Sequence, residues 1–260
     1  MCDSFGEYEW QVRSYECGPD GKARMDAICN YLQEAASLHA EEMGFSKSDF
    51  ESEGKDISWV LTRLRVKMFR YPQWEEGVRV VTYPRGGRRI VAWRDFELFD
   101  RQGERLGVAT SEWMIINLVT RKIVPIPEHV FACANTVRLP VLGETPFVAK
   151  IRWPEGAAAM VQKTFRARRC DIDLNGHVNN VHYIEWLLEA LSEPVPVCGE
   201  LELVFRSETF AGDDVCVSSC EAGMGGFILR CASPSGQDHV VARMCPLENM
   251  DHSVLNGGSK

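Results

Sequence analysis

The sequence contains no apolar run close to the roughly 20 residues that a membrane-spanning helix requires. Residues 1–9 carry neither the basic and apolar regions of a secretory signal nor an Arg- and Ser-rich transit segment. The ten cysteines include no CxxC pair, which argues against a zinc site and against a disulfide-stabilised secreted domain. A net charge of −8 gives no reason to expect nucleic acid as a partner. We therefore expect a cytoplasmic protein with no membrane span, metal ion, cofactor or nucleic-acid partner.

What the sequence does contain is the composition of a globular protein, with 45% apolar and 25% charged residues. Apolar positions at helical spacing predict one helix over 27–43 and another over 181–191. Alternating runs predict strands at 8–17, 59–69, 78–84, 89–100, 106–118, 122–126, 161–169, 200–208, 214–222, 226–232 and 239–245. One helix with a series of antiparallel strands, given twice, indicates an α+β protein.

A segment rich in proline and glycine separates the two halves. We place an N-terminal unit at 1–140, a linker at 141–156, a C-terminal unit at 157–247 and a polar, flexible tail at 248–260. In the N-terminal unit, four tryptophans are expected to fill the core between helix and sheet: Trp59, Trp74, Trp93 and Trp113. By pattern alone, two unrelated α+β domains stay open as an alternative.

The segment Asp171–Asn180 gathers the polar residue types that hydrolysis needs. Asp173, Asn175 and His177 alternate at a spacing of two, so in an extended segment their side chains share one face. The predicted helix follows directly, with Asn179 or Asn180 as its N-cap, and a helix N-terminus favours developing negative charge. The alternative interpretation is an Asn- and Gly-rich turn that caps an ordinary amphipathic helix.

Several sequence segments resemble the motifs of the fatty acyl-ACP thioesterases: Asp171–Trp186, Tyr31–Ala36, Trp59–Arg63 and Arg94–Phe96. The resemblance extends over roughly residues 5 to 250. It implies two tandem hotdog units, each a long helix wrapped by a curved antiparallel sheet. It also implies hydrolysis of the fatty acyl-ACP thioester, which releases free fatty acid and ends chain elongation. In relatives the first unit shapes the acyl pocket and the second supplies the catalytic residues.

The same resemblance implies that Asp173, Asn175 and His177 are catalytic, together with a glutamate on a strand that matches Glu208. Our working hypothesis is that Glu208 and His177 position and deprotonate water while Asp173 holds the imidazole. Asn175 and backbone N–H groups at the helix start would stabilise the oxyanion. A competing version makes a carboxylate the nucleophile, through a transient anhydride. The family often carries a cysteine after this glutamate, and Thr209 in that place argues against a cysteine nucleophile.

The implied partner is acyl carrier protein, whose acidity calls for local positive surface on this acidic chain. The candidate clusters, which a solvated charge run explains as well, are Arg85, Arg88 and Arg89, then Lys163, Arg166, Arg168 and Arg169, and then Lys150 with Arg152. Three other functions stay open: an acyl-CoA thioesterase, a hotdog hydratase and a non-catalytic acyl-binding protein. A homodimer of the chain also stays open.

Overall fold

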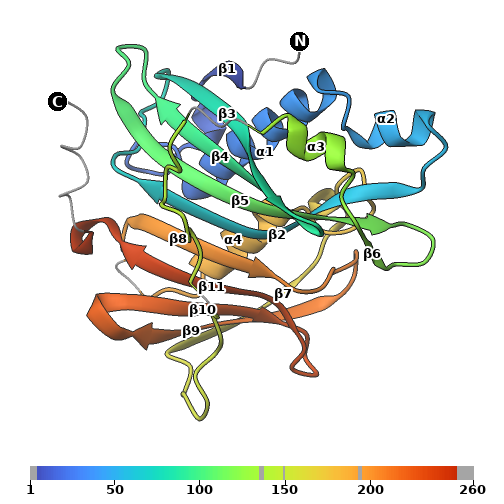
Figure 1. Cartoon of the computed structure of the whole chain (residues 1–260). Coiled ribbons are helices and arrows are strands. Elements are labelled where there is room, and N and C mark those ends of the chain that lie inside the picture. The colour runs from blue at the N-terminus through green and yellow to red at the C-terminus, as the bar shows by residue number, and fades with distance from the viewer. Residues whose placement is uncertain (1–4, 135–137, 149, 193–194, 251–260) are drawn as a thin grey trace.

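The computed structural model describes residues 5–134, 138–148, 150–192 and 195–250. Within them, eleven strands form one antiparallel sheet, and the helices α1 (Met25–Glu42) and α4 (Asn180–Leu188) lie together behind it in Figure 1. The α+β class is therefore confirmed, and both predicted helices are present close to their expected positions. No helix in these residues is long and apolar enough to cross a membrane.

The N-terminal unit contributes one side of the sheet. Its strands run β1-β3-β4-β5-β2, and β6 pairs with β5. The bounds are β1 Gly6–Gln11, β2 Ile57–Met68, β3 Gly77–Arg88, β4 Val91–Phe99, β5 Arg105–Asn117 and β6 Ile123–Val124. A 3-10 turn, η1 (Ser14–Glu16), ends the predicted strand 8–17 early, and the short helices α2 (Lys47–Ser52) and α3 (Glu128–Ala132) were not predicted.

The C-terminal unit contributes the other side in the order β8-β11-β10-β9-β7. The bounds are β7 Val161–Arg166, η2 Arg169–Asp171, β8 Cys198–Phe205, β9 Asp214–Ala222, η3 Gly223–Gly225, β10 Gly226–Ala232, β11 Asp238–Pro246 and η4 Leu247–Asn249. In each unit, the strands from the outer edge of the sheet to its middle are the unit's first, third, fourth, fifth and second strands in sequence order. One architecture is thus present twice in the chain.

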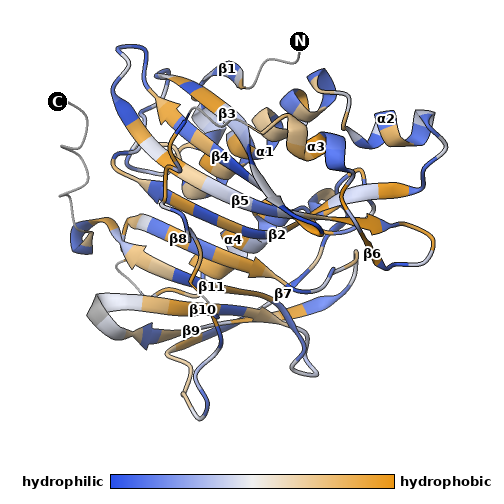
Figure 2. Cartoon of the chain, viewed as in Figure 1, coloured by the Kyte–Doolittle hydropathy of each residue, from blue (hydrophilic) through white to orange (hydrophobic). Residues whose placement is uncertain are grey.

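The two units join where β2 pairs with β8, from Arg63↔Val204 to Lys67↔Glu200. On the inner face of this seam, Leu64, Val66, Leu201 and Leu203 enter an apolar core that both helices share. Polar and apolar residues alternate along these strands in Figure 2, as a sheet buried on one face requires.

On the outer face of the seam, Glu202 is fully buried and ion-paired with Arg63. Burial raises the pKa of Glu202, and Arg63 opposes this effect by favouring the carboxylate. The linker passes over this pair, because Val148 donates its N–H to Glu202 at 3.0 Å and accepts from Arg63 through its carbonyl oxygen. The linker is therefore attached to the sheet by buried polar groups.

Two expectations were wrong in detail. Of the four tryptophans, Trp113 packs against the main core, Trp74 is exposed and Trp93 lies against the guanidinium groups of Arg85 and Arg88. Trp59 packs in a second, smaller apolar cluster with Phe45 and Phe50. The flexible tail does not begin at residue 248, because η4 is helical and Met250 is buried. The remainder of that predicted tail, 251–260, lies outside the described residues.

Candidate active site

The motif after β7 folds as a tight loop, so the predicted extended segment was wrong. Ile172 bridges to Val178, and within this bridge the Asp173 N–H donates to the His177 carbonyl oxygen at 2.9 Å. Gly176 donates to the Asp173 carbonyl at 3.0 Å and has φ +85°, a left-handed conformation that favours glycine. The backbone is therefore the Asn- and Gly-rich turn of the alternative interpretation. This turn, and not an extended segment, brings the side chains of Asp173, Asn175 and His177 together.

Asp173 organises this loop with its carboxylate. Its Oδ1 accepts the Asn175 N–H at 2.8 Å, an Asx turn, and its Oδ2 lies 3.4 Å from the Asn175 side-chain nitrogen. The same Oδ1 lies 3.9 Å from His177 Nδ1, too far for a hydrogen bond but close enough for charge interaction. Asn175 is exposed, and its side-chain nitrogen faces Asp173.

Glu208 meets His177 because the loop is tied to the segment after β8. The Val178 N–H donates to the Thr209 carbonyl oxygen at 2.9 Å, which brings the two segments side by side. His177 Nε2 then lies 3.4 Å from Glu208 Oε1, with 27% and 28% of the two side chains exposed. Glu208 stands beyond the end of β8 at Phe205, so its predicted place on a strand was wrong. The imidazole and the carboxylate form a pair that solvent and a substrate can reach.

The helix α4 begins beside this pair. Asn179, one of the two predicted N-caps, is the N-cap, and its Oδ1 accepts the Val181 N–H at 3.1 Å. The same oxygen lies 3.4 Å from the amide nitrogen of Gln33 on α1, which links α1 to the start of α4. The N-terminus of α4 thus lies three residues beyond His177, where its free N–H groups favour an oxyanion.

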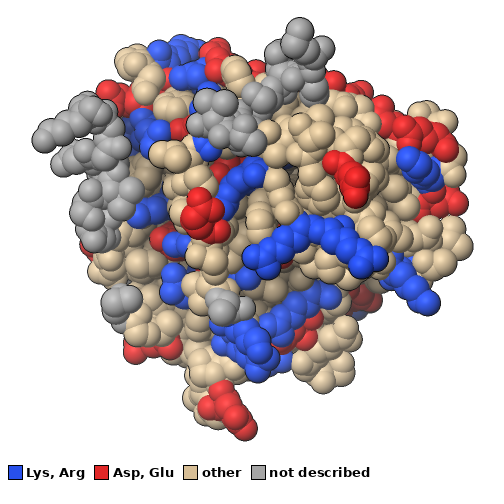
Figure 3. Space-filling model, viewed as in Figure 1, with Lys and Arg blue, Asp and Glu red and all other residues tan. Residues whose placement is uncertain are grey.

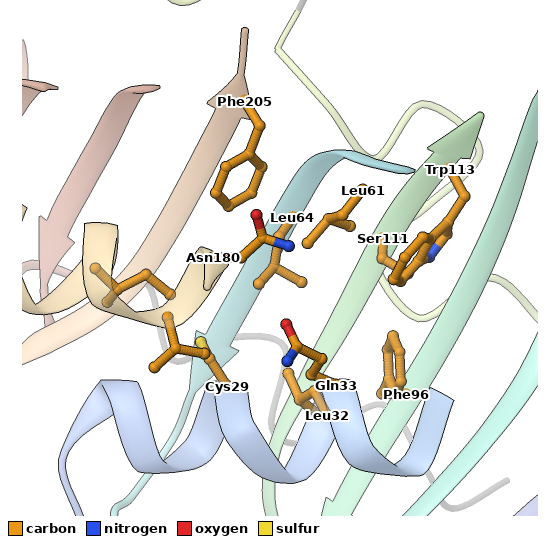
Figure 4. Close-up of a pocket in the computed structure, with 12 residues that line it drawn as sticks. Cys29, Leu32, Gln33, Leu61, Leu64, Phe96, Ser111, Trp113, Asn180 and Phe205 are labelled. Carbon is orange, nitrogen blue, oxygen red and sulfur yellow. The ribbon is translucent and has the colours of Figure 1, made fainter. Parts of the chain in front are cut away.

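A mostly apolar pocket opens between α1, α4 and the sheet (Figure 4). The side chains around it leave a free volume of about 20 Å³. The amides of Gln33 and Asn180 point into it among apolar side chains from both units. Its lining comprises Cys29, Leu32, Gln33, Leu61, Leu64, Phe96, Ser111, Trp113, Asn180, Val181, Ile184 and Phe205. Asn180 and Phe205 lie three residues along the chain from His177 and Glu208, which places the pocket close to the pair, although neither His177 nor Glu208 lines it.

The N-terminal unit contains a second copy of the same loop. Gly18 donates its N–H to the Lys22 carbonyl at 2.8 Å, and Gly21, with φ +74°, donates to the Gly18 carbonyl at 3.0 Å. The Ala23 N–H donates to the Pro72 carbonyl at 2.9 Å, just as Val178 donates to Thr209. The two loops therefore share their backbone, and both precede the first turn of the unit's helix.

Both copies also share an arginine–carboxylate contact before the loop. Arg13 binds Glu16, and Arg168 binds Asp171, each through its backbone N–H and its guanidinium group. What differs between the copies is the chemistry, with Asp173, His177 and Glu208 in the places of Gly18, Lys22 and Tyr71. The shared features are those a fold needs, and these differences leave the carboxylate–imidazole pair in the C-terminal copy alone. This correspondence between residues 16–21 and 171–176 was not predicted from the sequence.

The predicted basic clusters are partly engaged in ion pairs. Arg85 is nearly buried beside Asp95, and Arg168 holds Asp171. Two more cations pair with neighbouring carboxylates, Lys163 with Glu189 at 3.0 Å and Arg166 with Asp214 at 3.7 Å. All members except Arg85 are exposed, and among the described residues no ion pair is formed by Arg88, Arg89, Lys150, Arg152 or Arg169. Figure 3 shows lysine and arginine side chains gathered across the middle of the face seen in Figure 1.

Sequence comparison identifies the relatives of both units. A family model of the acyl-ACP thioesterase N-terminal domain matches residues 4–134, and one of the C-terminal domain matches residues 155–238. Oleoyl-acyl carrier protein thioesterase 2, chloroplastic, of Arabidopsis thaliana is 33% identical over 216 residues, which are 78% of this chain and 59% of that protein. Palmitoyl-acyl carrier protein thioesterase, chloroplastic, of Gossypium hirsutum is 33% identical over 75% of this chain and 48% of its own length. The chain thus spans about half the length of the curated relatives it matches.

Solved structures confirm the double-hotdog fold. An acyl-ACP thioesterase from Bacteroides thetaiotaomicron VPI-5482 has a TM-score of 0.79 at 23% identity, covering 93% of this chain and 97% of that one. The 12:0-ACP thioesterase from Umbellularia californica has a TM-score of 0.82 at 25% identity, covering 94% and 97%. Because the two family models together account for most of the sequence, in the order in which the two units occur, the chain belongs to the acyl-ACP thioesterase family.

Proposed function

We propose that this protein hydrolyses the thioester of fatty acyl-ACP and releases free fatty acid. The observation that carries the proposal is the His177–Glu208 pair, at 3.4 Å, beside a pocket lined mostly by apolar side chains. An apolar lining of this kind suits an acyl chain, and a partly exposed imidazole next to a carboxylate suits a water-activating base. Membership of the family, and relatives whose names specify oleoyl and palmitoyl acyl carrier protein, point to the same substrate class.

The proposed reaction uses a water molecule between His177, Glu208 and the thioester carbon. His177 takes a proton as the water oxygen attacks the carbonyl carbon, and Glu208 orients the water and the imidazole. The tetrahedral oxyanion faces the N–H groups at the start of α4, with Asn175 as a further donor once its side chain turns from Asp173 to the substrate. Collapse of the intermediate breaks the C–S bond, and the proton on His177 passes to the leaving thiolate. Asp173 keeps the loop and the imidazole in place.

The test is a comparison of carriers. Free fatty acid release should be measured from a panel of acyl-ACPs and from acyl-CoAs of the same chains, with kcat and KM for each. We expect a higher kcat/KM on acyl-ACP at the preferred chain length. A higher kcat/KM on acyl-CoA would instead indicate an acyl-CoA thioesterase. No release of fatty acid from either series would favour an acyl-binding protein.

Carrier docking should depend on exposed arginines. We expect Arg88→Glu with Arg89→Glu, or Arg169→Glu, to lower kcat/KM on acyl-ACP by about tenfold at low salt, because surface charges steer acidic partners and are screened over about 8–10 Å at physiological ionic strength. Arg168 is left unchanged because it holds Asp171. A small pantetheine thioester of the same chain is the control substrate. Equal losses on both substrates would mean damage to the site, and no loss on either would move the docking surface to Lys150 and Arg152.

A further inference from the structure

We propose that Arg121, supplied by the N-terminal unit, is a positioning residue for Glu208 in the C-terminal unit. This inference rests on the proposed function, in which Glu208 orients the attacking water. It means that neither unit contains a complete site by itself. The residue lies 87 positions before Glu208 in the sequence and comes from the opposite side of the β2–β8 seam.

The contact itself divides the Glu208 carboxylate between two partners. One oxygen accepts from the Arg121 guanidinium, and the other lies 3.4 Å from His177 Nε2. A glutamate side chain has several rotatable bonds, and a partly exposed one samples many rotamers unless something holds it. Arg121 supplies that second attachment, so the carboxylate stays directed at the imidazole.

The turn between β5 and β6 is built to present this side chain. Asn117 Oδ1 accepts the N–H groups of Val119 at 3.1 Å and Thr120 at 2.7 Å, and the Asn117 carbonyl accepts the Arg121 N–H at 2.8 Å. Arg121 itself has φ +57°, a left-handed conformation that is unfavourable for a residue with a Cβ. The backbone thus adopts a strained conformation at the residue that reaches Glu208.

Stabilisation of the fold does not account for this arrangement. Arg121 is 52% exposed and Glu208 28%, and ion pairs of that exposure contribute little to stability. The left-handed backbone at Arg121 costs about as much folding stability as such an ion pair contributes. In the N-terminal copy of the site, Tyr71 takes the place of Glu208 and donates its hydroxyl to the Cys198 carbonyl oxygen at 2.5 Å. Arg121 therefore binds the side chain at this place in the copy where that side chain is a carboxylate facing a histidine.

The experiment compares Arg121→Ala, Arg121→Lys and Arg121→Gly with the unchanged protein and with Lys122→Ala, a control in the same turn. We expect Arg121→Ala to lower kcat by about tenfold or more on both acyl-ACP and a small pantetheine thioester, with little change in KM, and to shift the pH–rate profile. Arg121→Lys should recover part of the rate because it retains the charge. Arg121→Gly should lose activity while its melting temperature stays equal or rises, because glycine relieves the strain.

Two further measurements distinguish a failure of this inference from a failure of the proposed function. If Arg121 acts through Glu208, adding Arg121→Ala to Glu208→Gln should cause no further loss in kcat. A crystal structure of Arg121→Ala should show the Glu208 carboxylate turned away from His177, and this readout needs no activity. An unchanged Glu208 position, an additive double variant, or a normal kcat and pH profile for Arg121→Ala would overturn the inference.

Discussion

Replacing His177 with alanine is expected to lower kcat for thioester hydrolysis by at least about a hundredfold, the scale of general-base catalysis. The reason is its location: Nε2 lies 3.4 Å from Glu208, next to the start of α4 and the apolar pocket. The backbone of the loop should survive, because its hydrogen bonds run between main-chain atoms and the Asp173 carboxylate. Acyl-ACP affinity and melting temperature should therefore stay close to those of the unchanged protein.

Lys22→Ala provides a matched control for this variant. Lys22 occupies the place of His177 in the N-terminal copy of the loop, with the same backbone hydrogen bond from the fourth residue before it. Lys22→Ala alters a loop of the same geometry that lacks the His177–Glu208 pair, so thioester hydrolysis should be unaffected. Near-normal turnover by a well-folded His177→Ala protein would contradict the proposed role of the imidazole.

Glu208→Gln is expected to reduce kcat by about a hundredfold to ten-thousandfold while leaving the fold unchanged. Glutamine keeps the size of the side chain but removes the charge that faces His177 and Arg121. The loss should appear in kcat on both acyl-ACP and a pantetheine thioester, since both present the same carbonyl. Full activity in this variant would show that Glu208 is neither base nor nucleophile.

Thr209→Val is the neighbouring control, because the loop uses only the carbonyl oxygen of Thr209, which accepts the Val178 N–H. Valine has nearly the same shape, so most of the activity should remain. A collapse in turnover, or an acyl ester trapped on Thr209, would revive a covalent hydroxyl mechanism. One turnover in ¹⁸O-labelled water then tests the nucleophilic role of Glu208. An unlabelled Glu208 oxygen in the first fatty acid released would show an anhydride that water opens at the glutamyl carbon, an intermediate that a base does not form.

The sequence was sufficient for the elements whose local pattern agrees with their final environment. The strands 214–222 and 226–232 were predicted with the bounds that β9 and β10 have, because their alternation matches one buried face. The short helices α2 and α3 were missed because five or six residues carry too little periodicity. Around Asp173 the alternation was misleading, since Gly176 and the Asx turn stabilise a reversal that a two-residue period does not reveal.

The candidate site was predictable only in part. Asp173, Asn175 and His177 lie within five residues of sequence, so their proximity could be expected before the structure was known. The contact between Glu208 and His177 depends on the Val178–Thr209 hydrogen bond, and the contact with Arg121 depends on how the two units join. Such contacts depend on the pairing of distant strands, which local sequence patterns do not encode.

The seam between β2 and β8 also determines how the protein can come apart. A C-terminal unit produced alone would leave β8 as an edge strand, with unpaired backbone groups facing solvent and Glu202 without Arg63. Its inner face would lose the apolar surface of α1 and β2 that closes the shared core. Opening this seam therefore exposes both units at once, which couples their unfolding into one cooperative event.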